Sequence, residues 1–184
     1  MNIELLKTLG TVKKLNQGDF VCVENNEDNT AYLLLQGGVD VVLGSFQDAS
    51  KRIASLHPGA VFGEMSLLEN KPRNASVIAN SDQTLVLEIE KINFLTILQS
   101  DKEVAWNLLC TLLKRTENMM SENKLVGFEA IAGYRKNNIY IQLKSLSRSQ
   151  FESIIEKDGE YALKLLKFLS SSLAEMNDEL MRRS

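Results

Sequence analysis

An acidic and a basic side chain, Glu64 and Arg73, lie in one short segment that reads VFGEMSLLENKPRNASV. The guanidinium of an arginine suits a phosphate, because its planar fork donates two parallel hydrogen bonds. A phosphate alone would repel Glu64, whereas a carboxylate accepts hydrogen bonds from the hydroxyls of a sugar. The two residue types together therefore predict a site for a compact ribose phosphate.

The residues around this pair predict a turn, one turn of helix and a returning strand. Gly63 opens a tight turn, a Met-Ser-Leu-Leu run follows Glu64, and Arg73 stands at the start of the next strand. The first N–H groups of a helix have no partners within it and can hold an anion. The segment can thus bind an anion between its backbone and Arg73.

The elements that must position these residues are short strands between residue 11 and about residue 90. Gly18, Gly44, Gly59 and the pair Gly37-Gly38 separate runs that are rich in β-branched residues. Turn residues at this spacing predict a compact roll or barrel of about eight strands. The runs are DFVCVE, TAYLLLQ, GVDVVLG, RIASLHP, NASVIAN and QTLVLEIE.

After residue 90 the apolar residues recur at three- and four-residue steps, which predicts helices. Residues 94–119 align without gaps on residues 151–176, at an offset of 57 from Phe94 to Phe151. Two amphipathic helices can share a pattern by chance, but the matched identities favour a duplication. A strand-like run precedes each copy, LVLEIE before the first and IYIQLKSL before the second. Residues 125–150 are too few for a second roll.

The segment FGEMSLLENKPRNASV resembles the phosphate-binding cassette of cyclic-nucleotide-binding domains, and the likeness covers about residues 11–120. The resemblance implies an α+β fold, a jelly-roll-like antiparallel β-roll with flanking helices, that binds cAMP or cGMP. By position, Glu64 would hold the ribose 2′-hydroxyl and Arg73 the cyclic phosphate. Backbone N–H groups around Gly63, Met65 and Ser66 would close around that phosphate. The expected ligand-binding residues are Phe62, Gly63, Glu64, Met65, Ser66, Arg73, Asn74 and Ala75.

Three features depart from the family pattern or leave it open. Asparagines in ENNEDN replace the glycine that often follows the second strand, and Ser66 stands where many relatives have alanine. Asn74 can bond either purine, so the base stays open, although the leading hypothesis takes cAMP before cGMP. An apolar residue caps the purine in relatives; here it would be Met119, Met120 or Phe128, and a dimer seam is the alternative role of these three side chains.

The expected organisation is a cyclic-nucleotide-binding domain over residues 1–124 and a helical extension over residues 125–184, the remnant of a second copy. The leading hypothesis is a sensor that relays binding to its C-terminal helices, which could also form a homodimer or contact an effector protein. The alternative is a degenerate roll that acts by protein contact, in which Arg73 and Glu64 pair only with each other. A transcription regulator is disfavoured, because residues 125–184 carry a net charge of only +1.

Composition and the remaining candidates exclude several functions. The 184 residues are 44% hydrophobic with a net charge of -3, so no basic excess predicts binding to nucleic acid or lipid. Cys22 and Cys110 form no metal-binding or disulfide motif, and no apolar leader or span is evident, which predicts a cytoplasmic protein without a membrane partner. His57 and Ser66 lack acid–base partners. We therefore expect neither an enzyme nor a metal or cofactor besides the nucleotide.

Overall fold

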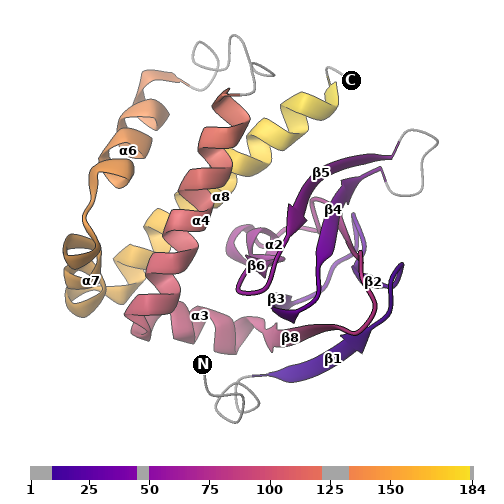
Figure 1. Cartoon of the computed structure of the whole chain (residues 1–184). Helices are drawn as coiled ribbons and strands as arrows, with labels where there is room; N and C mark the ends of the chain where they lie inside the picture. Colours follow the sequence, from indigo (N-terminus) through magenta and orange to yellow (C-terminus); the bar gives the residue numbers. More distant parts are fainter. Residues whose placement is uncertain (1–9, 45–49, 122–132, 183–184) are drawn as a thin grey trace. The chain divides into compact units, whose positions relative to one another are not determined.

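The computed structural model describes residues 10–44, 50–121 and 133–182 of the chain. These residues form eight strands, all in antiparallel pairs, and six helices (Figure 1). Contacts divide the chain into two compact units, residues 1–94 and 95–184. The expected boundary after residue 124 falls outside the described residues, so it stays a prediction.

The first unit is a roll of two four-stranded sheets, as the sequence predicts. One sheet has the order β1 (Thr11–Leu15), β8 (Thr84–Glu90), β3 (Thr30–Gln36) and β6 (Val61–Phe62). The other has the order β2 (Phe20–Cys22), β7 (Ser76–Ala79), β4 (Val39–Leu43) and β5 (Lys51–Leu56). Alternate side chains of a strand face the same side, so each sheet turns one apolar row inward. The shared core consists of Cys22, Tyr32, Leu34, Val39, Phe62, Val77 and Val86.

The turns of the roll use asparagine as well as glycine. Asn25, in the turn after β2, has a φ of 65°, which confirms that an asparagine builds the turn where relatives often have glycine. A second asparagine, Asn70, has a φ of 57° and ends the short helix α2 (Glu64–Glu69). Both turns border Arg73, since Asn25 N–H donates to the Arg73 carbonyl over 2.9 Å and Arg73 follows Asn70 closely in sequence.

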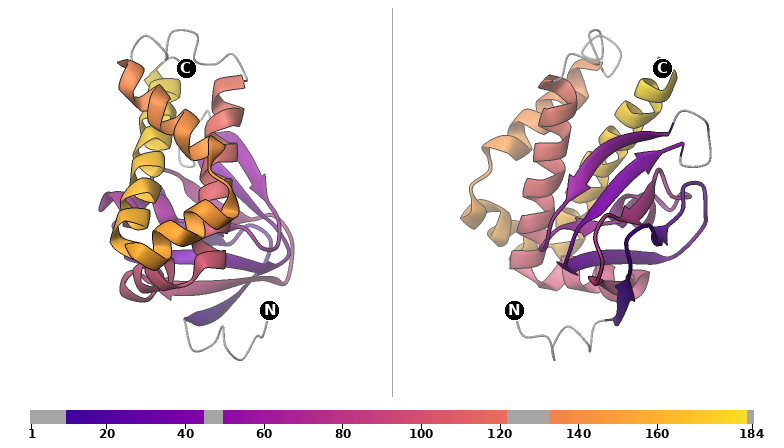
Figure 2. Two further views of the ribbon diagram at one scale, coloured as in Figure 1. Left: turned by 90° about the vertical axis from the view of Figure 1, so that its left-hand side faces the viewer. Right: turned by 45° about the vertical axis from the view of Figure 1, so that its right-hand side comes forward.

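The second unit contains the helices after the roll. They are α3 (Lys91–Ser100), whose first turn belongs to the first unit, α4 (Lys102–Ser121), α6 (Gly133–Ser145), α7 (Arg148–Lys157) and α8 (Gly159–Arg182). Figure 2 shows α4 and α8 running in the same direction, and the two helices contact each other. A capping box at Ser147 fixes the start of α7, because its hydroxyl accepts from the backbone of Gln150, whose side chain accepts from Ser147 N–H.

One prediction for this unit is wrong. The run IYIQLKSL is not a strand but lies almost wholly in α6, whereas LVLEIE lies in β8 as expected. Tyr140 and Leu143, three residues apart, are buried, while Ile141 between them is 58% exposed. That burial follows the helical period of 3.6 and not the two-residue period of a strand, and the β-branched residues suggested the strand.

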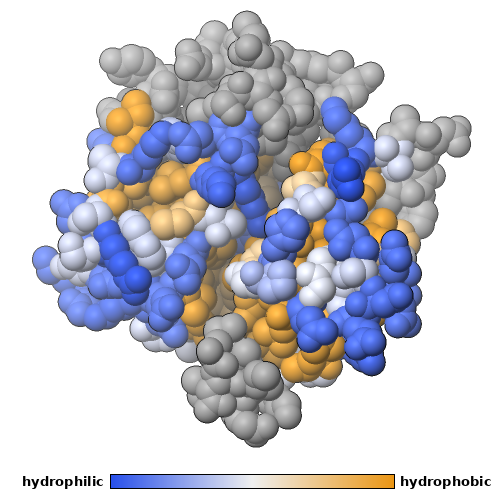
Figure 3. Space-filling view, in the orientation of Figure 1, coloured by the Kyte–Doolittle hydropathy of each residue, from blue (hydrophilic) through white to orange (hydrophobic). Residues whose placement is uncertain are grey.

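Large exposed hydrophobic side chains of the described residues come from separate elements. Apolar and polar surface alternate on the face that Figure 3 shows. Single exposed apolar side chains are normal on a folded protein and do not by themselves indicate a binding surface. The exposed side chains are Phe20, Ile53, Ile92, Ile141 and Tyr161. None of the helices in the described ranges is long and apolar enough to cross a membrane.

Candidate functional site

The site is built around Arg73, which precedes β7 and is 3% exposed. The turn after β2 holds its backbone in place. Asn25 N–H donates to the carbonyl of Arg73, and Arg73 N–H donates to the carbonyl of Asn26, each over 2.9 Å. This reciprocal pair fixes where the arginine leaves the backbone, so that its side chain enters the roll.

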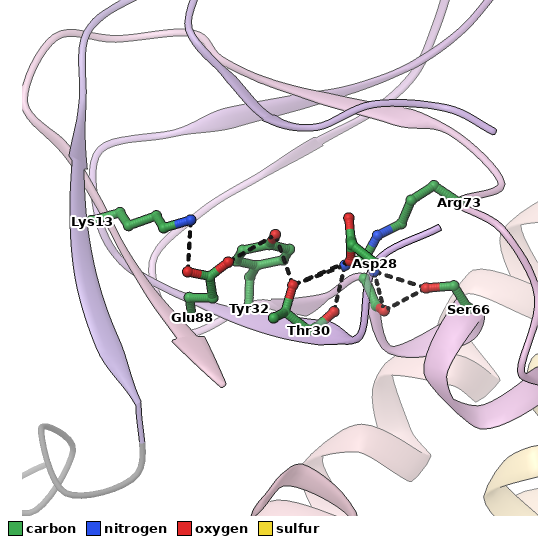
Figure 4. A network of polar contacts seen from close by, with 8 residues as sticks. Lys13, Asp28, Thr30, Tyr32, Ser66, Arg73 and Glu88 are labelled. Carbon is green, nitrogen blue, oxygen red and sulfur yellow. Dashed lines mark hydrogen bonds and ion pairs between the residues drawn. The ribbon is translucent and has the colours of Figure 1, made fainter. Parts of the chain in front are cut away.

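The guanidinium of Arg73 is bonded at both terminal nitrogens (Figure 4). Nη1 donates to the Gly63 carbonyl over 2.6 Å and to Ser66 Oγ over 2.8 Å. Nη2 forms an ion pair with Asp28 and donates to the Thr30 carbonyl over 2.5 Å. Nε, by contrast, is buried and makes no hydrogen bond within the described residues. One donor of the buried cation therefore remains for a further acceptor.

Burial lowers the pKa of Arg73, while the negative charge of Glu88 acts to raise it. An arginine nevertheless stays charged in a protein, so Arg73 carries a positive charge in the interior of the roll. The guanidinium carbon lies 5.4 Å from the centre of the Tyr32 ring, within the range of a cation–π contact. The guanidinium is thus a buried cation, and Asp28 offsets part of its charge.

Gly63 is required by its conformation and by the space around it. Its φ is 71°, in the left-handed region that glycine adopts without strain. A Cβ at this position would lie 2.7 Å from Nη1 of Arg73 and 3.1 Å from Cδ2 of Tyr32. Glycine therefore lets the turn before α2 approach the guanidinium closely.

A row of polar side chains runs from Arg73 across the first sheet to the surface (Figure 4). Thr30 Oγ1 accepts from Nη2 over 3.1 Å and donates to Tyr32 Oη over 2.9 Å. Tyr32 Oη donates to Glu88 over 3.5 Å, and Glu88 pairs with Lys13 over 2.6 Å. Burial raises the pKa of Tyr32 to about 12, so its hydroxyl stays a neutral donor at physiological pH.

Most of the predicted site residues lie close to this centre. Glu64 is the first residue of α2 and is 1% exposed, and Ser66 is buried two residues later. Phe62 is buried and stacks on Tyr32, with ring centres 5.2 Å apart. Met65, Asn74 and Ala75 are half-buried neighbours of these residues in the chain.

The predicted purine lids cannot be placed. Phe128 and the side chains of Met119 and Met120 lie outside the described residues, so their role stays a prediction. The alternative in which Arg73 pairs only with Glu64 does not match the site, because the ion-pair partner of Arg73 is Asp28.

Asp28, Thr30 and Tyr32 are site residues that sequence reasoning missed. Their signal is weak, since Asp28 stands in an acidic turn and the other two stand in a strand of ordinary composition. A buried arginine needs a counter-charge and hydrogen-bond acceptors, so the carboxylates of the acidic turn after β2 were the available signal for Asp28. Among the described residues, no cluster of His, Cys, Asp or Glu could hold a metal ion.

Residues 12–101, which include β2 to β8 and the whole surrounding of Arg73, match the model of the cyclic nucleotide-binding domain. Residues 12–101 belong to the cyclic nucleotide-binding domain family. Both the cyclic nucleotide-binding fold and the β-roll expected from the sequence are thereby confirmed.

Two curated relatives of this domain have regulatory names. The chain is 31% identical over 113 residues to the cyclic AMP receptor protein of Thermus thermophilus, which covers 61% of the chain and 52% of the relative. It is 30% identical over 93 residues to the cAMP-dependent protein kinase regulatory subunit of Blumeria graminis, covering 50% of the chain and 23% of the relative. The chain therefore spans about half the length of the first relative and less of the second.

A solved structure resembles most of the chain. The catabolite activator protein of Thermus thermophilus matches with a TM-score of 0.58 and 22% sequence identity, covering 89% of this chain and 79% of that one. At this identity the likeness concerns the fold alone. The order of a β-roll followed by helices thus occurs in a known fold.

Proposed function

We propose that the cyclic nucleotide-binding domain of this chain binds a cyclic nucleotide, with Arg73 on the cyclic phosphate and Glu64 on the ribose 2′-hydroxyl. The observation that carries the proposal is the buried guanidinium of Arg73, whose Nε–H has no acceptor among the described residues. A buried donor without an acceptor is costly, and an anionic oxygen placed there would form a charge-assisted hydrogen bond.

The residues around Arg73 support the same ligand. Gly63 lets the turn before α2 lie close to the guanidinium, and Ser66 Oγ holds Nη1 in a fixed direction. Glu64 is a buried carboxylate on the same short helix, where a sugar hydroxyl would donate to it. Phe62, Met65, Asn74 and Ala75 complete the proposed contact set.

We further propose cAMP before cGMP as the ligand and one of Met119, Met120 and Phe128 as the cover of the purine. The two relatives named above are a cyclic AMP receptor and a cAMP-dependent kinase subunit by name, which supports this order. Binding is proposed to shift the arrangement of the helices from residue 104 onward, as a ligand does when it prefers one of two conformations. The effector that reads such a shift is proposed to contact the C-terminal helices.

Calorimetric titration with cAMP and with cGMP tests the proposal, using protein shown to be free of bound nucleotide. We expect Arg73→Ala to weaken binding by about 2–5 kcal/mol, which is roughly 30- to 5,000-fold in Kd. Arg52→Ala is the matched control, because Arg52 is exposed and pairs with Asp40 on β4. Unchanged affinity in Arg73→Ala would contradict the role of Arg73.

A second candidate is a roll that acts by protein contact without a nucleotide. It is favoured by the fact that both terminal nitrogens of Arg73 are already bonded to Asp28, Thr30, Gly63 and Ser66. In this case neither nucleotide would give a heat of binding with folded wild-type protein. Binding of either nucleotide that Arg73→Ala abolishes would exclude the second candidate.

A further inference from the structure

The two copies of the repeated sequence form the same helical pair twice. At the offset of 57 residues, the bounds of α3 (Lys91–Ser100) coincide with those of α7 (Arg148–Lys157), and Lys102 at the start of α4 coincides with Gly159 at the start of α8. The junctions also agree, since Asp101 and Asp158 each accept from backbone N–H groups that open the following helix. The duplication expected from the sequence is therefore matched by its helix boundaries and junctions.

The two copies contact each other through equivalent residues. Lys102, at the start of α4, forms an ion pair with Glu156 of α7. At the equivalent place on the other copy, a Cβ on Gly159 would lie 2.5 Å from the carbonyl oxygen of Gln99 on α3. Position 102 corresponds to 159 and position 99 to 156, so the same two positions meet twice with the copies exchanged, once through a side-chain ion pair and once through a close backbone approach.

Such reciprocity defines a two-fold interface, in which residue i of one half touches j of the other and j touches i. The apolar stripes agree with it, because the helices α4 and α8 pack together and their equivalent positions are buried. These pairs are Ala105 with Ala162, Leu109 with Leu166 and Leu112 with Leu169, all of which are 0% exposed. The helices run in the same direction, as a two-fold axis parallel to them requires (Figure 2).

We infer that α7–α8 takes, within one chain, the place of a second copy of α3–α4. The face of α4 that α8 covers is then a self-complementary surface, and its alternative occupant is the α4 face of another copy of this chain. The wild-type protein is a monomer at this face, and loosening one copy converts it into a symmetric dimer. This inference is independent of nucleotide binding and is tested without nucleotide.

The test compares Leu166→Asp on α8 with Leu109→Asp on α4 and with the double variant, by sedimentation equilibrium. Each single variant breaks the internal pair but leaves one intact apolar face, so each is expected to double the mass. The double variant has no intact face and is expected to stay monomeric. Lys164→Asp, at an exposed position on α8, is the control and should remain monomeric like the wild type.

Folded single variants that stay monomeric would overturn the inference, and so would a double variant that dimerises as well as the singles. Should loss of far-UV helicity show that an aspartate unfolds the chain, Leu166→Ala and Leu109→Ala replace the aspartate variants with the same expected and contrary results. A second measurement uses an engineered disulfide, the lock, between α4 and α7. Lys102→Cys and Glu156→Cys are introduced in a Cys110→Ser background. Oxidation of this pair should return Leu166→Asp to a monomer, and a dimer that persists with the lock closed would contradict the inference.

Discussion

Arg73 shows how a charge is kept in the interior of a small roll. A buried cation without acceptors would strongly destabilise the fold, so several groups from different elements converge on it. Gly63 precedes α2 and Ser66 lies in its first turn, whereas Asp28 and Thr30 come from the turn before β3 and from its start. The arginine therefore joins the turn after β2 to the turn before α2.

Asp28→Asn tests this role of the carboxylate. The variant keeps the shape of the side chain but removes the only carboxylate that the described contacts give Arg73, so we expect the free energy of unfolding to fall by about 1–3 kcal/mol. Urea denaturation monitored by circular dichroism measures the change. Glu27→Gln, at the exposed neighbouring position, should leave stability within about 0.5 kcal/mol of wild type. Equal stabilities of the two variants would show that the ion pair contributes little.

The residues of the binding motif were predictable from the sequence, whereas the residues that hydrogen-bond to Arg73 from other elements were not. Arg73, Glu64 and Gly63 stand in a motif whose residue types and spacing are specific, and the structure places all three at one centre. Asp28 reaches Arg73 only because the turn after β2 folds back onto the start of β7. Contacts between residues so distant in sequence depend on sheet topology, which local patterns do not encode.

At the scale of elements, turn geometry decides how closely the backbone approaches the site. Gly59 and Gly63 both have positive φ, of 93° and 71°, but their surroundings differ. An added Cβ at Gly59 would meet nothing within 4 Å, whereas one at Gly63 would press on Arg73 and Tyr32. Substitution of Gly59 therefore measures the free energy lost to backbone strain alone, whereas substitution of Gly63 measures that strain together with the steric contact.

Gly63→Ala should therefore lose more stability than Gly59→Ala. We expect about 1 kcal/mol from backbone strain at Gly59 and about 2–4 kcal/mol at Gly63, where displacement of the guanidinium adds to the strain. Gly63→Ala should also weaken nucleotide binding, while Gly59→Ala should not. Thermal unfolding and calorimetric titration of both variants measure these effects. Equal losses of stability would mean that the contact with Arg73 is easily relaxed.

The helices illustrate what periodicity predicts and where it fails. The apolar faces of α4 and of its repeat α8 were predictable, because in a long amphipathic helix many apolar residues recur at the helical period. The run in α6 was misread, because Ile139 and Ile141 favour strands by type and the segment is short. Packing of Tyr140 and Leu143 on one side decides in favour of the helix.

At the scale of the molecule, each unit contains one cysteine, whose rate of chemical modification measures how accessible that part of the chain is. Cys22 is buried in the core of the roll, and burial raises the pKa of its thiol, so that little reactive thiolate forms. Cys110 on α4 is exposed. Partial burial also raises the pKa of Cys110, but its exposure should let a thiol reagent modify it faster than Cys22, which can react only when the roll opens.

Bound nucleotide should slow the labelling of Cys22, whereas the labelling of the exposed Cys110 does not require the roll to open. A ligand at about 100 times its Kd stabilises the unit that binds it by about 2.7 kcal/mol, which slows labelling through unfolding about 100-fold. Mass spectrometry of each modified cysteine over time gives both rates from one sample. Labelling of Cys22 at an unchanged rate, with nucleotide shown to be bound, would place the binding energy outside the roll.

The reciprocal contacts between α3–α4 and α7–α8 also limit how the sequence can change over time. Gly159 lies against the backbone of Gln99, and Glu156 pairs with Lys102. Each copy therefore packs against the other. A side chain larger than hydrogen at position 159 would press on the backbone at the end of α3, and a substitution at 156 leaves Lys102 without its ion-pair partner. The two halves of this duplication therefore cannot diverge independently, and related sequences should keep glycine at position 159 and show paired substitutions at positions 102 and 156.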